Sequence, residues 1–254
     1  MRSETTWHPT LAWDYSRLAA DYAKRAPYHP DLIREGMRMA DIRAPALAVD
    51  LGAGTGRVSL ALAAQGWQVD AVEPCREMHE LGAGASTGRA VRWHRTTGEA
   101  TGLASGRYRI ACFGSSLNVM DRAAALAEAR RLVGDGGNVL CAYNHRCLDD
   151  PLQREIQRMI ERLLGHYDAG ERRGDAAVSI ADGGCFGSVR SARLAFVHSY
   201  ASEDFVDAFR AHATLVRQAG DRLDAVLGGI RGMIAGAARV EVPFETVLSV
   251  GRAL

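Results

Sequence analysis

Lysine is almost absent from this sequence of 254 residues, because Lys24 is the only one and the other basic side chains, apart from histidine, are arginines. An excess of charge of one sign is also missing, since the 31 Lys and Arg residues nearly balance the 30 Asp and Glu residues and give a formal net charge of +1. Such a chain has no strong field to attract nucleic acid, an anionic membrane or an acidic protein. Small molecules are therefore the expected partners. The arginine preference and the abundant alanine are typical of a GC-rich bacterial genome.

Long hydrophobic runs and paired cysteines are missing as well. No apolar run reaches the roughly 18 residues that cross a bilayer, and the N-terminus shows no hydrophobic segment of a secretory signal. The five cysteines are scattered, without a CxxC pair. Cys141, His145 and Cys147 lie close in sequence, but no fourth ligand is evident, so no metal site is expected. Together with the balanced charge, these absences predict a soluble cytoplasmic protein that binds neither nucleic acid nor membrane. We expect it to be a monomer or homodimer.

Apolar segments of strand length alternate with helical patterns along the middle of the chain. The patterns predict strands over 46–52, 67–74, 90–98, 108–116 and 138–146, with helices over 57–66, 76–84 and 122–137 between them. Such alternation requires right-handed crossovers and a parallel sheet that is covered on both faces. The predicted fold class is α/β, Rossmann-like and doubly wound, with a mostly parallel sheet.

The turn after the first predicted strand contains three alternating glycines, in the stretch VDLGAGTGRVSLALA over residues 49–63. Gly52, Gly54 and Gly56 are followed by Arg57, so the GxGxxG fingerprint of dinucleotide sites is not met, and the GK[ST] of a P-loop is missing. In open α/β sheets, ligands bind outside the carboxyl ends of the strands. Asp50, just ahead of the turn, would repel a phosphate and favour an amine or sulfonium cation.

Glu73 ends the second predicted strand, about 20 residues beyond the glycines, where an acidic side chain accepts hydrogen bonds from ribose hydroxyls. Together with Asp50 it predicts a ligand that is an adenosine-containing cation.

At these residues the sequence resembles the class I S-adenosylmethionine-dependent methyltransferases of the small-molecule type. The stretch over 49–63 resembles motif I, and VDAVEPCREM resembles motif II, which implies that Glu73 binds the ribose and Met78 packs on the adenine. TTGEATGL is similar to the segment after the third strand and implies that Glu99 lies near the adenine amino group. CFGSSLNVMDR resembles the stretch that lines the junction of methyl donor and acceptor. VEVPFETVLSV resembles the antiparallel last strand of a seven-stranded sheet.

The resemblance implies S-adenosylmethionine as cofactor and S-adenosylhomocysteine as product. In the N-terminal stretch DYSRLAADYAKRAPYHP it implies two tyrosines that close over the sulfonium, although seven-residue spacing also fits plain packing. The cofactor site expected in this way consists of Tyr15, Tyr22, Asp50, Gly52, Gly54, Gly56, Glu73, Pro74, Met78, Gly98, Glu99, Ala100, Phe113 and Ser115.

Substrate contacts are expected at the carboxyl ends of the fourth and fifth predicted strands. The stretch AYNHRCLDD makes His145 the best candidate for a catalytic base, because an imidazole titrates near neutrality, and a structural histidine is the alternative. His8 and His212 could reach the same pocket. The residues expected to contact the substrate are Ser116, Asn118, Tyr143, Asn144, Arg172 and Arg173, of which the last two could pair with a carboxylate or belong to a solvated loop.

We expect one domain over 1–254. It comprises an N-terminal helical cover (1–42), a cofactor-binding core (43–146), an inserted lid or substrate segment (147–191) and a C-terminal strand–helix–strand unit (192–254). The expected reaction is methyl transfer to a small-molecule O-, N- or C-nucleophile in specialised metabolism. An NPPY-type signature after the fourth strand is missing, which argues against an amino group on a base or glutamine. A non-catalytic regulatory or scaffold protein that binds the cofactor is the alternative, and a nicotinamide oxidoreductase is a weaker one.

Overall fold

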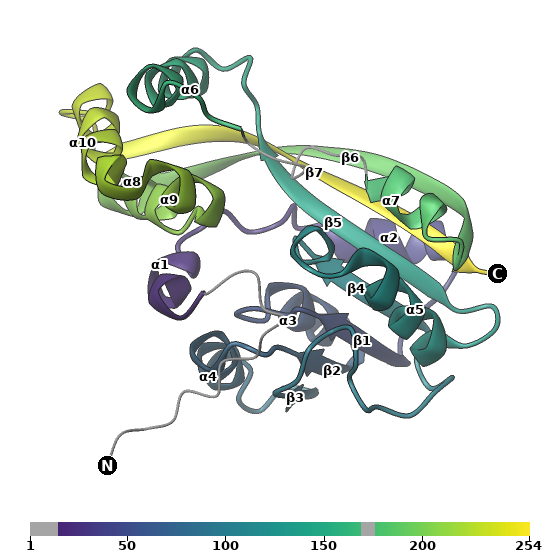
Figure 1. The fold of residues 1–254 in the computed structure, drawn as a ribbon. Helices are drawn as coiled ribbons and strands as arrows, with labels where there is room; N and C mark the ends of the chain where they lie inside the picture. The colour runs from purple at the N-terminus through teal and green to yellow at the C-terminus, as the bar shows by residue number, and fades with distance from the viewer. Residues whose placement is uncertain (1–14, 169–175) are drawn as a thin grey trace.

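The sheet and its helices are seen in a computed structural model that describes residues 15–168 and 176–254. Seven strands form one sheet in the order β3-β2-β1-β4-β5-β7-β6 (Figure 1). The first five are parallel, and β7 runs antiparallel to both β5 and β6. The strands are β1 (Leu47–Leu51), β2 (Gln68–Val72), β3 (Val91–His94), β4 (Ile110–Gly114), β5 (Asn138–Arg146), β6 (Phe186–Ala201) and β7 (Arg239–Ala253). This architecture confirms the predicted fold class. From β1 the chain continues to β2 and β3 on one side of the sheet and then returns to β4 on the other side, so the strand order reverses between β1 and β4.

Alternate residues of the central strands face two different hydrophobic layers, as the two-residue period of a strand requires. Ile110 and Cys112 of β4 pack with α2 (Leu32–Ala40) and α3 (Arg57–Ala64), whereas Ala111 and Phe113 pack with α5 (Arg122–Val133) and α7 (Ala176–Asp182). Both faces are therefore covered, and the strands read as continuous apolar runs. The remaining helix of this half, α4 (Arg76–Ala85), follows β2.

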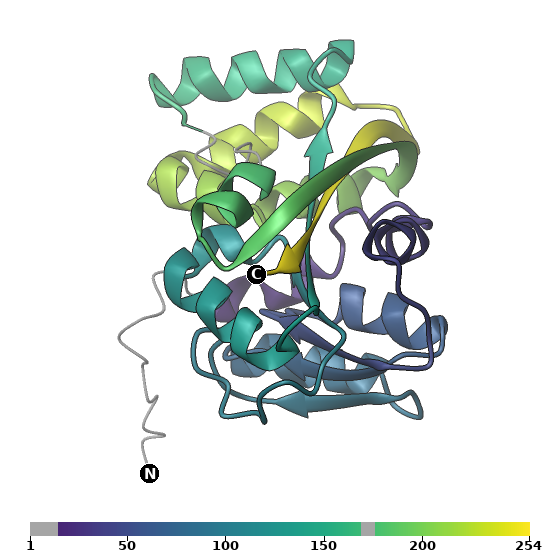
Figure 2. The same cartoon turned by 90° about the vertical axis from the view of Figure 1, so that its right-hand side faces the viewer.

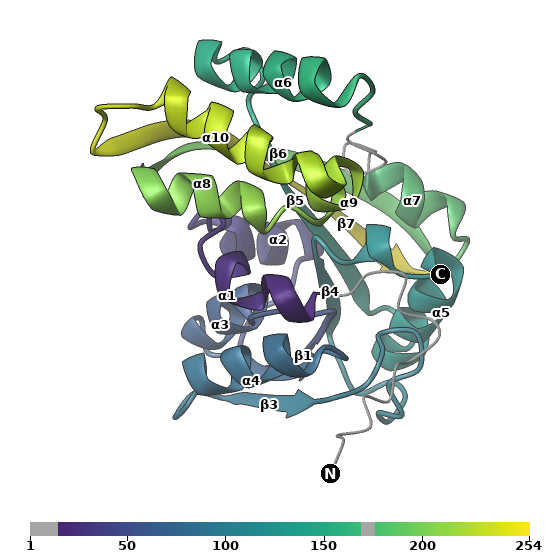
Figure 3. The ribbon, with the colours of Figure 1, turned by 60° about the vertical axis from the view of Figure 1, so that its left-hand side comes forward.

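A third hydrophobic cluster lies at the far ends of the long strands β6 and β7. It is built by α6 (Pro151–Leu164), α8 (Ser202–Arg210), α9 (Ala213–Ala219) and α10 (Leu223–Met233), which we call the cap. Figures 1 and 2 show the cap at one end of the molecule and the α/β half at the other. The short α1 (Ala19–Tyr22), preceded by η1 (Ser16–Leu18), contacts both α8 of the cap and α4 (Figure 3).

The helices differ from the sequence prediction more than the strands do. Where one helix was expected in the strand–helix–strand unit over 192–254, the chain forms α8 and α9, because His212 leaves the helical conformation and its Nδ1 accepts a hydrogen bond from the Leu215 amide at 3.3 Å. A further helix, α10, follows α9 through η4 (Gly220–Arg222). Within 147–191, α6 belongs to the cap while α7 covers the sheet.

Among the described helices, none is both long and apolar enough to cross a membrane. Over 15–168 and 176–254, His, Cys, Asp and Glu side chains form no group of three or more that could hold a metal ion.

Candidate functional site

The glycine-rich turn joins β1 to α3 at the carboxyl edge of the sheet. Gly52, Gly54 and Gly56 have φ values of 68°, 58° and 82°, in the left-handed region that glycine adopts without strain. A Cβ atom on Gly52 would lie only 2.6 Å from the Ser116 Cβ atom. The turn is therefore packed tightly against the segment that follows β4, and its backbone is open to a ligand on the other side.

Asp50 lies beneath this turn. Its Oδ2 accepts hydrogen bonds from the Ser59 amide at 3.0 Å and the Ser59 hydroxyl at 2.6 Å. Its Oδ1 has no hydrogen-bond partner within the described part of the chain, and burial raises the pKa of the carboxyl to about 6. The structure does not bring Asp50 to the surface of either cavity described below. Strand alternation explains this, because Asp50 points with Ala48 toward α3, opposite to Leu51.

Glu73 stands just after β2 and faces the turn. Its Oε2 accepts from the Gly54 amide and its Oε1 from the Cys75 amide, each at 2.8 Å. Only 7% of the residue is exposed, and this burial raises the pKa of the carboxyl to about 7 against the opposite effect of the two amides. Each oxygen keeps a second lone pair with which it can accept a hydrogen bond from a ligand hydroxyl.

A cavity of about 80 Å³ lies over the glycine turn, and we call it the donor cavity. It brings together many of the residues predicted for the cofactor site: Tyr15, Tyr22, Gly52, Gly54, Glu73, Pro74, Met78, Gly98, Glu99 and Ser115, together with Ser116 from the predicted substrate set. Its wall also includes Cys75, Thr97, Gly114, Val119 and Met120, which the motifs did not single out.

Besides Asp50, three predicted cofactor residues do not line this cavity. Phe113 is fully buried in the sheet's apolar layer, because it alternates with the residues that face α2 and α3. Gly56 is instead the N-cap residue just before α3, where an added Cβ would lie 3.0 Å from the Trp93 ring. Ala100 is exposed, and its carbonyl accepts a hydrogen bond from the Thr96 hydroxyl at 3.2 Å.

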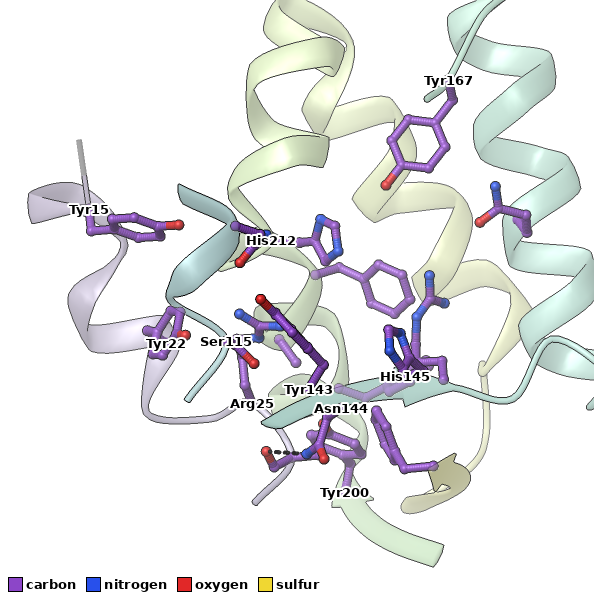
Figure 4. A pocket seen from close by; sticks show the side chains of 18 residues that line it. Tyr15, Tyr22, Arg25, Ser115, Tyr143, Asn144, His145, Tyr167, Tyr200 and His212 are labelled. Atoms are coloured by element: carbon purple, nitrogen blue, oxygen red, sulfur yellow. Dashed lines mark hydrogen bonds between the residues drawn. The ribbon is translucent and has the colours of Figure 1, made fainter. Parts of the chain in front are cut away.

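A second cavity, of about 120 Å³, lies between the cap and the carboxyl end of β5, and we call it the acceptor-side cavity (Figure 4). It contains four of the residues predicted to act on the substrate side: Asn118, Tyr143, Asn144 and His145. Tyr15, Tyr22 and Ser115 line both cavities, so the two spaces adjoin. His212 is present as the sequence suggested, whereas His8, Arg172 and Arg173 lie outside the described residues.

Two polar residues of β5 differ in what they do in this wall. The Asn144 amide group donates to the Pro27 carbonyl at 2.6 Å and accepts from the Thr246 hydroxyl at 2.5 Å, so it ties the segment after α1 to the sheet. Burial raises the pKa of the Tyr143 hydroxyl well above its usual value, and this side chain stays neutral. The ring centres of Tyr143 and His145 are 6.3 Å apart.

The acceptor-side cavity contains several residues that sequence reasoning missed. They are Arg25, Ala26, Arg146, Gln157, Tyr167, Tyr200, Phe205, Ala208, Phe209 and Phe244. Arg146 was noted at the strand end without a role. Phe205 and Phe209 of α8 pack in the cap and also line the cavity.

Comparison with known proteins adds to this geometry. A family model described as a methyltransferase domain matches residues 49–141, from β1 into β5. The search of curated proteins finds no match.

Solved structures share the fold. A candidate type II methyltransferase from Anaeromyxobacter dehalogenans is 19% identical with a TM-score of 0.64, over 90% of this chain and 97% of that one. The YcgJ protein from Bacillus subtilis is 17% identical with a TM-score of 0.53, over 89% and 99%. A candidate methyltransferase from Bacillus halodurans is 14% identical with a TM-score of 0.52, over 87% and 97%. Residues 49–141 thus match a methyltransferase domain, and the sheet that contains them has the fold of these solved structures.

Proposed function

We propose that this chain is a class I S-adenosylmethionine-dependent methyltransferase, and that it acts on a small molecule that binds in the acceptor-side cavity. The observation that carries the proposal is the contact between the two cavities, which share Tyr15, Tyr22 and Ser115. Methyl transfer is an in-line displacement, so donor and acceptor must meet at one point with water excluded. Holding them in that orientation can lower the activation free energy by roughly 7 to 11 kcal/mol.

The residues of the donor cavity fit the cofactor. Gly52 and Gly54 present backbone without side chains, and the carboxylate of Glu73 has lone pairs left for two ribose hydroxyls. Met78, only 3% exposed, offers an apolar contact for the adenine, and Glu99 an acceptor for its amino group. When bound, the cofactor supplies a methyl group on a sulfonium that is already an activated leaving group.

Tyr15 and Tyr22 stand where the two cavities meet. Their rings are in edge-to-face contact with centroids 6.0 Å apart. An aromatic ring attracts a nearby cation through its quadrupole, so these rings suit the sulfonium end of the donor. In this proposal they cover that end and exclude water from the point of transfer.

His145 is the proposed general base on the acceptor side. It lines the acceptor-side cavity with the neutral Tyr143 beside it. A base is required when the acceptor keeps its proton at the working pH, and imidazole is suited to that task. Within the same proposal the enzyme is cytoplasmic and serves specialised metabolism, which a biosynthetic gene cluster around its gene would support.

The test has a binding step and a transfer step. Calorimetry with S-adenosylhomocysteine should show binding, which Glu73→Gln weakens about tenfold or more by removing a charged acceptor. The matched control Glu80→Gln changes an exposed ion pair with Arg76 on α4 and should leave affinity unchanged. Labelled S-adenosylmethionine should then methylate a member of an acceptor panel. Absence of cofactor binding, or binding without transfer to any acceptor, would contradict the proposal.

A further inference from the structure

The acceptor-side cavity has an unbalanced set of charges. Arg25 and Arg146 line it together with His145 and His212, and no Asp or Glu belongs to its wall in the part of the chain that the structure describes. A half-buried cation costs free energy unless an anion or hydrogen-bond acceptors compensate it. The composition of the wall therefore favours an anionic ligand.

Arg25 is the clearer of the two cations. Its guanidinium carbon lies 4.9 Å from the centre of the Tyr22 ring, and the structure shows no ion pair between Arg25 and a carboxylate of residues 15–168 or 176–254. Neighbouring carboxylates are paired elsewhere, since Asp207 binds both Lys24 and Arg210. The positive charge of Arg25 is thus directed to the cavity without a carboxylate from the described chain.

Two further arginines add to this positive potential. The guanidinium carbon of Arg146 lies 4.6 Å from the centre of the Phe209 ring, and its Nη1 donates to Gln153 Oε1 at 2.8 Å. Behind Arg25, the half-buried Arg57 donates to backbone carbonyls, among them that of Ala23 at 2.8 Å. The carbonyls that Arg57 contacts are neutral, so they satisfy its donors but leave its charge in place.

The rest of the wall is aromatic. Tyrosines reach this space from the position just before η1, from α1, β5 and β6, and from the segment after α6 (Figure 4). Phe205, Phe209 and Phe244 complete the apolar surface. Flat rings in such a wall suit a planar ligand, because aromatic pairs stack or meet edge to face.

Two amide oxygens in the wall lack partners. Asn118 Oδ1 and Gln157 Oε1 are buried and accept no hydrogen bond from the described residues. A buried acceptor without a donor is costly, so a ligand hydroxyl would satisfy either one.

We propose that the methyl acceptor is an aromatic molecule, with at least one hydroxyl, whose carboxylate or phosphate group is bound by Arg25 and Arg146. The inference rests on the proposed function, because it assigns the acceptor to the acceptor-side cavity. A cationic amine is the opposite case, since it would meet two guanidinium groups and no carboxylate from the described wall.

Binding can be measured on the full chain saturated with S-adenosylhomocysteine, which requires no methyl transfer. The probes are the hydroxylated forms of benzoate, cinnamate and phenylacetate, each beside its neutral amide, and hydroxyphenyl phosphate. We expect at least one acid or the phosphate to bind about tenfold or more tightly than the matched neutral compound. The carboxylate and phosphate probes identify which anion the site takes. Amides that bind as tightly as the acids, or a panel in which no anion binds, would overturn the proposal.

Variants then locate the preference. Arg25→Gln and Arg146→Gln should each reduce the preference for the anion about tenfold, whereas Arg25→Lys should keep part of it by retaining the charge. The matched control is Arg231→Gln, an arginine of α10 that pairs with Glu203 away from the cavity, and it should bind as the wild type does. An unchanged anion preference in both Gln variants would overturn the assignment.

Affinity for S-adenosylhomocysteine is the check on each variant. Retained affinity shows that the protein is folded with its donor cavity intact. Lost cofactor affinity in Arg25→Gln, with the anion preference kept, would assign Arg25 to the cofactor's carboxylate and contradict the proposal. Failure of label transfer alone would contradict the proposed function while leaving the measured anion binding to decide the inference.

Discussion

Replacing Glu73 by glutamine removes a buried carboxyl whose pKa burial raises from 4.5 to about 7. Because the pKa is higher in the folded protein than in the unfolded chain, this group contributes fully to stability when the pH is below its unfolded pKa. The contribution is lost as the pH rises through the folded pKa of about 7. Above that pH the ionised carboxylate costs the folded state the equivalent of the whole pKa difference, about 3 kcal/mol. At pH 5 the same cost is only about 1 kcal/mol, since the folded carboxyl is largely protonated.

Glutamine has one acceptor oxygen where the carboxylate has two. Either the Gly54 or the Cys75 amide then loses its partner, which costs about 1 to 2 kcal/mol at both pH values. The variant should therefore be close to the wild type in stability at pH 5 and about 2 kcal/mol more stable at pH 8. It should bind S-adenosylhomocysteine less tightly at pH 8, because the ribose loses a charged acceptor.

Urea unfolding at the two pH values measures the difference directly. Glu80→Gln on the surface of α4 serves as the control and should show no comparable gain between pH 5 and pH 8. A difference in unfolding free energy between Glu73→Gln and the wild type that does not change with pH would refute the reasoning.

Three further changes test neighbouring parts of the site. Asp50→Asn should raise stability at pH 8 by up to about 3 kcal/mol in urea unfolding, since burial raises the pKa of that carboxyl to about 6. Calorimetry should show cofactor affinity within about twofold of the wild type, because Asp50 contacts Ser59 and not the cavity. Gly52→Ala should lower the unfolding free energy by about 3 kcal/mol, since its Cβ would lie 2.6 Å from that of Ser116 at a φ of 68°, and an unchanged urea midpoint would contradict this. His145→Gln should reduce the single-turnover transfer rate about 100-fold while cofactor affinity is kept, and an equal rate would exclude it as the base.

The sheet was predictable because its signals are local. Residues 139–143 are apolar between a glycine pair with Asn138 on one side and polar residues on the other, and β5 has the predicted bounds, Asn138–Arg146. Gly52 and Gly54 were identified by the turn that they form, and Glu73 by its place at the next strand end. Each of these features follows from neighbours in the chain, so one sequence contains the information.

Other features depend on packing between distant segments. Asp50 was expected in the ligand site because it ends a strand, but the side of the sheet that it faces depends on the register that places it over Ser59. Arg25 and Phe209 meet in one cavity only because α8 folds back over α1. Apolar spacing in a helix predicts a buried face without saying whether another helix or a ligand covers it.

The position of the cofactor tests the central claim most directly. A crystal structure with S-adenosylhomocysteine should show the ribose on Glu73, the adenine beside Met78, and the sulfur at the junction formed by Tyr15, Tyr22 and Ser115. That result would place the departing methyl group at the entrance to the acceptor-side cavity. A cofactor bound elsewhere, or one whose sulfur faces away from that junction, would contradict the account.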